Sequence, residues 1–213
     1  MDTKQMFLDL MPILLSNIPK SIYGDRRRVE VLAWAVVALC FTKSVNLNLW
    51  EEVVISRAQL ASSRERRFSR WLHNPRVDTH AYFAPLLQAA ITDWPQDSPL
   101  MVALDTSDLA NGYILIRTSL VYRSRAIPVS WSVIKHASTS VSFEQYQVVL
   151  DRMLTTLPKG AKVVLLADRG FAHKKLVRYC AKNHISFRLR IKLNTKVKLS
   201  NGTIVSVSQI CPD

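Results

Sequence analysis

The chain has 213 residues and a formal net charge of +13 at neutral pH. A charge of this size and sign indicates a polyanionic partner, and nucleic acid fits best because neutralised phosphates release counterions. Hydrophobic residues make up 48% of the chain, with only 5 glycines and 9 prolines, so a disordered basic tail is excluded. A basic ribosomal protein or a protein of a membrane surface remains as an alternative class.

The cysteines and the hydropathy of the chain indicate in which compartment the protein is expected. Cys40, Cys180 and Cys211 are widely spaced and odd in number, so no disulfide framework is indicated and a reducing cytosol is expected. Cys180 and His184 are spaced as one helical turn, but without a second pair of ligands we predict no zinc site. The longest apolar run, 31–41, is too short to span a bilayer and predicts a core helix. We therefore expect a cytoplasmic protein that does not enter the membrane.

The first forty residues are predicted to be helical. Apolar residues recur at helical spacing in 1–19, and Pro12 is expected to interrupt that short docking helix. Asp25 precedes three arginines and a strongly apolar run at 29–42, which indicates an N-cap for a core helix. The arginines at 26–28 oppose the helix dipole in a first turn, so they indicate either a phosphate contact or a solvated basic turn.

A basic amphipathic helix is predicted after this. Residues 46–61 have the apolar spacing of one helix, and in 62–72 the side chains of Phe68, Trp71 and Leu72 share one face that would meet a core. The arginines on the opposite side are Arg64, Arg67 and Arg70. An apolar stripe and an arginine stripe, after two other helices, suit a small DNA-binding unit. The alternative is a solvated basic helix that packs on a core.

The pattern changes near the middle of the chain. A helix is expected at 77–94, and the polar, proline-bounded stretch 95–99 predicts a domain boundary between residues 98 and 99. The elements expected after it are strands at 100–105, 113–121 and 125–135, a helix at 143–157, a strand that ends on Asp168, a basic helix and a strand that ends near 192. Alternating residues around Asn201-Gly202 predict a hairpin at 195–208.

Two of these strands end on an acid. The apolar run 163–167 is typical of a strand buried on both faces, and Asp168 follows it. The run 100–104 is followed in the same way by Asp105. A carboxylate in such a place needs a cation, a donor or water, so each acid is either a helix cap or a ligand. If the strands are neighbours in one sheet, the acids could share a divalent cation, as in two-metal phosphoryl transfer.

Longer motifs surround the two acids. The first acid lies in VALDTSD at 102–108. The second lies in ADRGF at 167–171, which continues as F-x4-L-x3-C-x3-H-I-x-F-x-x-R-I-K to Lys192. These motifs resemble those of DDE-type insertion-sequence transposases, in the branch with DRGF around the second acid. The resemblance covers roughly residues 26–192.

The resemblance implies an α+β (or α/β) chain with an RNase H-like core. In that core the first acid lies on the first strand and the second acid just after the fourth, and Asp105 and Asp168 occupy those places. They would be the catalytic and metal-binding residues. The domains expected on this basis are a helical DNA-binding region at 1–98, a partial RNase H-like core at 99–194 and the start of a β-rich insertion at 195–213.

The same resemblance implies an activity and partners. We expect an enzyme that uses Mg²⁺ (or Mn²⁺), nicks transposon ends and joins them to target DNA. The expected partners are DNA and either further copies of the chain or a full-length transposase in mixed oligomers, in the bacterial cytoplasm at the nucleoid. Two rivals remain: a non-catalytic DNA-binding remnant of a transposase, and a structure-specific nuclease that hydrolyses without joining.

The family has a third acid, a Glu within a Tyr-Arg-Glu-Lys motif, and this sequence contains no such motif. After Asp168 the last acid is Asp213, the final residue, which is not given the role. Asp108 stays open as a helper or ligand, whereas a position at a helix start explains Glu144. We expect weak cation binding and poor or no joining, as for a truncated element or one that continues in another reading frame.

Cations that surround the second acid are expected to contact the DNA backbone. They are Arg169, Lys174, Lys175, Arg188, Arg190 and Lys192. Because alternate residues of a strand face one way, the last three are expected to form one row. The alternative is a solvated sheet edge that charge protects against aggregation.

Overall fold

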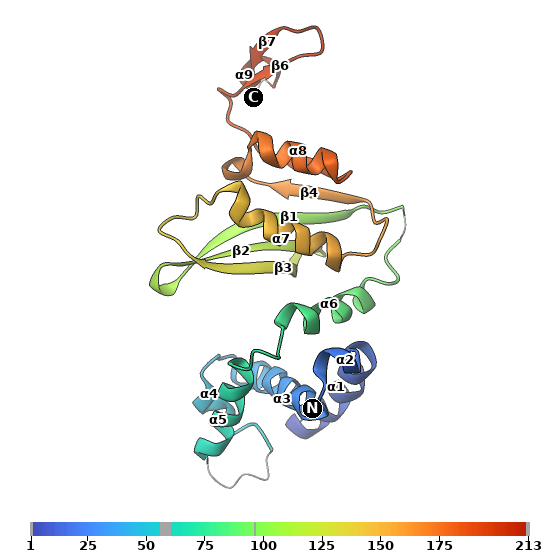
Figure 1. Ribbon diagram of the computed structural model, residues 1–213, viewed down its shortest axis with the longest axis vertical. Helices are drawn as coiled ribbons and strands as arrows, with labels where there is room; N and C mark the ends of the chain where they lie inside the picture. The colour runs from blue at the N-terminus through green and yellow to red at the C-terminus, as the bar shows by residue number, and fades with distance from the viewer. Residues whose placement is uncertain (1, 56–60, 96, 212–213) are drawn as a thin grey trace. The chain divides into compact units, whose positions relative to one another are not determined.

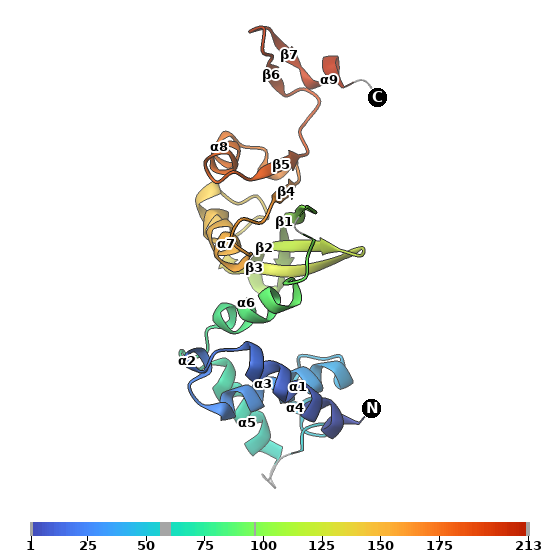
Figure 2. The same cartoon turned by 90° about the vertical axis from the view of Figure 1, so that its right-hand side faces the viewer.

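The computed structural model describes residues 2–55, 61–95 and 97–211. Within these ranges the chain has mixed α and β structure, as predicted, and divides into two compact units, Met1–Thr92 and Asp93–Asp213 (Figure 1; Figure 2). This division lies between Thr92 and Asp93, slightly before the boundary expected at 98/99. No helix within the described ranges combines the length and the apolar character that a bilayer crossing demands.

The first unit is helical. Its helices are α1 (Thr3–Asn17), α2 (Lys20–Tyr23), α3 (Arg26–Thr42), α4 (Leu47–Trp50), α5 (Ala61–Leu72) and α6 (Thr79–Ala90). Asp25 caps α3 as predicted, since its carboxylate accepts a 2.9 Å hydrogen bond from the backbone N–H of Arg27. Pro12 lies inside α1, so the predicted interruption is wrong. Burial of Met11 and Leu14 offsets the hydrogen bond that proline removes.

Helix α3 forms the centre of the first unit, with Val29 and Val37 fully buried. One apolar cluster joins it to α1 and α6 through Met11 and Tyr82. Another cluster joins it to α4 and α5, and Phe68 of α5 is buried there. The packing of α5 on α3 therefore sets which arginines of the basic helix reach solvent.

Two predictions for this unit are wrong in part. In place of one helix at 46–61, the described residues contain α4 at Leu47–Trp50, a turn after it and, at residue 61, the start of α5; residues 56–60 lie outside the described ranges. The adjacent β-branched residues at 53–55 disfavour the continuation of α4. Leu72 was expected to face the core together with Phe68, but 57% of its surface is exposed because α5 ends at that residue.

The second unit is built on a five-stranded sheet. The strands are β1 (Leu100–Leu109), β2 (Tyr113–Tyr122), β3 (Arg125–Lys135), β4 (Val163–Ala167) and β5 (Ser186–Leu189), in the spatial order β3-β2-β1-β4-β5. β1, β2 and β3 are antiparallel neighbours, whereas β4 runs parallel to β1 and β5 parallel to β4. The chain order of strands and helices is the one that the sequence predicted.

Helices α7 (Phe143–Thr156) and α8 (Lys174–Lys182) cover one face of this sheet (Figure 1; Figure 2). Both crossovers, from β3 to β4 and from β4 to β5, step in the same direction, and right-handed connections then place both helices on one side. Under them, Val102, Ile116 and Leu165 are fully buried. The residues that alternate with these along the strands point to the opposite side of the sheet, which we call the charged face. It comprises Met101, Ala103, Asp105, Arg117, Leu166, Asp168, Arg188 and Arg190.

Tight turns join the neighbouring antiparallel strands. Arg123 and Ser124 both have positive φ, 46° and 62°, as a two-residue hairpin loop between β2 and β3 requires. A second hairpin, β6 (Lys196–Lys198) with β7 (Ile204–Ser206), confirms the prediction at 195–208. Its second arm is shorter than expected, because the short helix α9 (Val207–Ile210) begins directly after β7.

Candidate active site

The two predicted acids lie next to each other at the end of the β1–β4 ladder. Leu104 and Ala167 form its last pair, and both are on the helix-covered side of the sheet. Asp105 and Asp168 follow directly, so they are neighbours across two parallel strands and both belong to the charged face. Adjacent strands are about 4.8 Å apart, a spacing over which two carboxylates can share one cation.

Asp105 does not end its strand, contrary to the prediction. β1 continues to Leu109 because β2 pairs with it throughout, from Asp105 opposite Arg117 to Leu109 opposite Tyr113. The partnership with β4, by contrast, stops at Leu104. Beyond that residue β1 is an edge strand on the β4 side, which suits the polar segment that follows the acid.

Neither acid caps a helix. Asp168 occupies the N-cap position before a 3-10 turn, Arg169–Phe171, but its side chain makes no capping hydrogen bond with the described residues. Asp105 lies within a strand. Since the helix-cap interpretation fails for both, the acids are left as possible ligands.

Asp108 faces away from the acid pair. It lies three residues beyond Asp105 on the same extended strand, and side chains three residues apart on a strand point to opposite faces. The alternative that Asp108 completes the ligand set is therefore wrong. The sequence left that alternative open because it did not reveal that β1 extends past the first acid.

Two pockets meet at the acid pair. A pocket of about 540 Å³ lies over β1, β4 and β5, and its charged lining residues are Asp105, Asp168, Arg188 and Arg190. A second pocket of about 300 Å³ separates the acids from the loop at 139–141 and from Phe171. The hydroxyl of Thr106 donates a 3.1 Å hydrogen bond to the carbonyl of Thr139, which fixes that loop beside the acids.

Each acid faces an arginine from a flanking strand. Nη2 of Arg117, on β2, lies 3.5 Å from Oδ2 of Asp105. Nη1 of Arg190, just after β5, lies 3.9 Å from Oδ1 of Asp168. The two carboxylate side chains are 57% and 61% exposed, so these ion pairs contribute little to folding. The two arginines do balance the charge of the two carboxylates, so the four side chains together carry no net charge.

The acid pair fits a weakly held divalent cation. Carboxylate oxygens are the hard ligands that Mg²⁺ and Mn²⁺ prefer, and Mg²⁺ keeps several waters when a protein offers few ligands. Among the residues that the structure describes, no group of three or more His, Cys, Asp or Glu side chains gathers around a common point. Asp105 and Asp168 are therefore the two carboxylates that could hold such a cation.

The cations predicted around Asp168 divide into three sets. Arg188 and Arg190 line the larger pocket with the acids. Arg169, Arg190 and Lys192 line an adjoining pocket of about 530 Å³. β5 ends at Leu189, so Lys192 does not continue a strand row as predicted. Lys174 is exposed on α8 but lines neither of these pockets.

Lys175 has a structural partner. Its ammonium forms an ion pair with the Glu144 carboxylate of α7, and the hydrogen bond from Lys175 lowers the pKa of that carboxyl to about 2. A second link joins the same helices, because the Tyr179 hydroxyl donates a 2.7 Å hydrogen bond to Asp151. Burial and this bond raise the pKa of Tyr179. Lys175 therefore joins α7 to α8, and it is a poorer candidate for a phosphate contact than Arg188 or Arg190.

The arginines of α5 are also unequal. Arg64 is half-buried and donates a 2.6 Å hydrogen bond to the carbonyl of Glu51. Arg67 lies 3.9 Å from Glu30 of α3. Arg70 is exposed, and so is Arg66, which the prediction omitted. Because Arg66 and Arg70 are spaced by four on one helix, they lie on one side of it.

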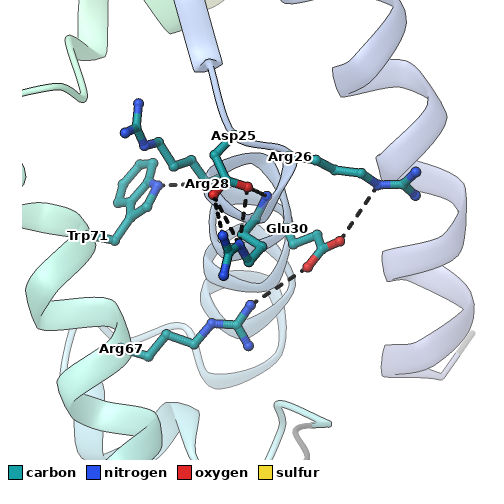
Figure 3. A network of polar contacts seen from close by, with 7 residues as sticks. Asp25, Arg26, Arg28, Glu30, Arg67 and Trp71 are labelled. Atoms are coloured by element: carbon teal, nitrogen blue, oxygen red, sulfur yellow. Dashed lines mark hydrogen bonds and ion pairs between the residues drawn. The ribbon is translucent and has the colours of Figure 1, made fainter. Parts of the chain in front are cut away.

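Glu30 connects the basic groups of α3 and α5, as Figure 3 shows. Its carboxylate lies 3.6 Å from Arg26 and 3.9 Å from Arg67. Close by, the indole of Trp71 donates a 2.9 Å hydrogen bond to the carbonyl of Arg28. These contacts hold α5 against the start of α3.

Sequence reasoning missed Arg117. A usable signal is present, because Asn111 and Gly112 both have positive φ and form the turn between β1 and β2. A hairpin centred on residue 111 pairs positions equally far from it, which places Arg117 opposite Asp105. Because the first strand was predicted to end at Asp105, the pairing of Asp105 with Arg117 was not considered.

Comparisons with known proteins supply no family for this chain. No family model matches it, and no curated protein matches it. The acids, the arginines and the pockets of the charged face are therefore the features on which a function can be based.

Proposed function

We propose that the chain is a DDE-type transposase with an incomplete active site. The single observation that carries the proposal is the adjacency of Asp105 and Asp168 on one face at the end of the β1–β4 ladder. The strand order β3-β2-β1-β4-β5, with α7 and α8 as crossovers, supports an RNase H-like core. The VALDTSD and ADRGF motifs supply the two acids at the positions that this family uses.

In this proposal the chain's own residues divide the work. Asp105 and Asp168 would hold Mg²⁺ or Mn²⁺, which when bound stabilises charge on the reacting phosphate and activates water. Arg188 and Arg190 line the pocket that contains the acids, where they would bind and orient the phosphodiester. Arg169 and Lys192 extend the cationic lining into the adjoining pocket and suit the next stretch of the same DNA strand.

The incomplete ligand set limits the expected activity. Two carboxylates hold a divalent cation less firmly than three, and Mg²⁺ dehydrates reluctantly. We therefore expect slow nicking and little or no strand joining. A non-catalytic DNA-binding protein is the second candidate, favoured by the net charge of +13 and by the arginines that already face both acids.

Three single substitutions test the catalytic proposal, each assayed for nicking of supercoiled DNA with Mn²⁺ and for DNA binding. D105N and D168N should each abolish nicking and leave binding intact, because amides are poor ligands of hard cations. D108N is the matched control, since Asp108 lies on the same strand but faces the opposite side, and it should nick like the parent chain.

The outcomes separate the candidates. Nicking that survives D105N would show that these acids are not catalytic. DNA binding without any nicking by the parent chain would favour the non-catalytic protein. Efficient joining of DNA ends by the parent chain would contradict the claim that the active site is incomplete.

A further inference from the structure

Four charges lie in a row across the charged face, one from each of four neighbouring strand positions. Arg117 is directly opposite Asp105 in the β1–β2 register. Asp105 and Asp168 follow the last pair of the β1–β4 ladder. Arg190 follows Leu189, the residue paired with Ala167, and its backbone N–H donates to the Ala167 carbonyl at 2.9 Å. The order across the sheet is therefore cation, anion, anion, cation.

The outer cations are held loosely by the inner anions. The separations of 3.5 Å and 3.9 Å are ion-pair distances, longer than the 2.7–3.2 Å of a hydrogen bond. The Arg190 side chain is 82% exposed and the Arg117 side chain is 38% exposed. Exposed pairs of this kind are weak, so each guanidinium can leave its carboxylate at small cost.

A phosphodiester is a better partner for a guanidinium than these distant carboxylates. The planar fork of arginine matches two phosphate oxygens with two short, charge-assisted hydrogen bonds. An arginine that turns to a phosphate also leaves its carboxylate without a positive neighbour. That carboxylate then attracts a divalent cation more strongly, because the repulsion between the guanidinium and the cation is removed.

We infer that Arg117 and Arg190 exchange partners when DNA binds, and that this exchange couples the binding of DNA to the binding of a divalent cation. In the free chain the arginines neutralise Asp105 and Asp168 and weaken their affinity for the cation. With DNA bound, they contact backbone phosphates and release the acids. The inference rests on the proposed function, since it needs the cation to bind at these acids. Coupling of this kind is reciprocal, so the cation must also tighten DNA binding.

The first test measures Mn²⁺ affinity of the free protein by electron paramagnetic resonance, which reports unbound Mn²⁺. R117Q and R190Q should each tighten Mn²⁺ binding about fivefold, which corresponds to about 1 kcal/mol, the upper range for an exposed ion pair. R125Q is the matched control. Arg125 is an exposed arginine at the start of β3, and its substitution removes the same charge at a position away from the two acids. It should leave Mn²⁺ affinity unchanged.

The second test measures binding of a fluorescent duplex oligonucleotide by anisotropy, with and without Mn²⁺. Mn²⁺ should tighten DNA binding about fivefold in the parent chain and less than twofold in R117Q/R190Q. The D105N/D168N variant is the control for effects of Mn²⁺ on the DNA itself. Any change that Mn²⁺ causes in DNA binding by this variant is the background, and only tightening beyond it counts as coupling. Circular dichroism of each variant confirms that the fold is retained.

The results distinguish two kinds of failure. If no Mn²⁺ binding is lost in D105N/D168N, the acids do not hold a cation, and the proposed function falls together with this inference. If binding depends on the acids but R117Q and R190Q match the parent chain, the proposed function stands and the exchange is wrong. Equal tightening by Mn²⁺ in the parent chain and in R117Q/R190Q would also overturn the exchange.

Discussion

The two faces of the five-stranded sheet differ in burial and in charge, although neighbouring residues of the same strands supply both. Leu104 and Leu165 point toward the helices and are at most 3% exposed. The residues that follow Leu104 and Ala167 point the other way, and both are carboxylates with more than half of their surface exposed. Burial therefore stabilises the fold from one side, while the other side presents charges that folding does not require.

Arginines show the same division in the first unit. Arg64 is half-buried and bonded to a backbone carbonyl, and the Arg28 guanidinium donates to the carbonyl of Tyr23 at 3.1 Å. Such groups hold elements together. Arg70 is exposed, and Arg117 and Arg190 of the second unit face only loosely held acids. The net charge predicts a polyanionic partner, and the contacts of each arginine within the chain decide which arginines could meet that partner.

The largest expected effect compares adjacent residues of β4 that face opposite sides. L165A should lower the free energy of unfolding by about 3 kcal/mol, because Leu165 is fully buried and its truncation leaves a cavity. L166A should cost about 1 kcal/mol, since Leu166 lies half-buried on the charged face. Urea denaturation of both variants measures the difference. Equal losses would show that the charged face is as tightly packed as the other.

A smaller effect is expected from the polar contact under α7. Ser130 is fully buried; its hydroxyl lies 2.6 Å from that of Thr118 and donates a 2.7 Å hydrogen bond to the carbonyl of Val149. S130A should cost about 2 kcal/mol because two buried groups lose their partner. S132A, on the same face of β3 but partly exposed, is the control and should cost less than about 0.5 kcal/mol. A similar loss in both variants would mean that the contact contributes nothing specific.

The sequence predicted what depends on local chemistry. Asp25 as a cap, the hairpin within 195–208 and the order of strands and helices in the second unit all follow from short-range patterns. The adjacency of Asp105 and Asp168 was expected on the condition that their strands are neighbours in one sheet, and β1 and β4 are such neighbours.

The errors involve long-range pairing or packing. The length of β1 depends on β2, which holds the polar residues after Asp105 in a ladder that their own propensity would not form. The contact of Lys175 with DNA stays a prediction, but the sequence did not indicate that Glu144 of another helix pairs with this side chain. The contacts of such side chains depend on residues that are distant in the sequence. Hydrophobic periodicity carries no information about those distant partners.

The smallest expected effect concerns the ion pair between Glu144 and Lys175, which joins the two helices on the covered side. The hydrogen bond from Lys175 lowers the pKa of Glu144 from 4.5 to about 2. Since the pKa is depressed in the folded state, the pair stabilises the fold above pH 4.5, and its contribution is lost as the pH falls from 4.5 toward 2. E144Q should therefore be slightly less stable than the parent chain at pH 6, with the difference shrinking as the pH falls through this range.

Urea denaturation between pH 6 and pH 2.5 measures this trend, and K175Q provides the matched partner. If the two side chains act only through each other, the losses in E144Q and K175Q should not add in the double variant at pH 6. Additive losses, or a difference that is the same at every pH, would mean that the carboxylate acts through another group. In that case Lys175 would not be held by Glu144, and this residue of α8 would be as good a candidate for a phosphate contact as Arg188 of β5.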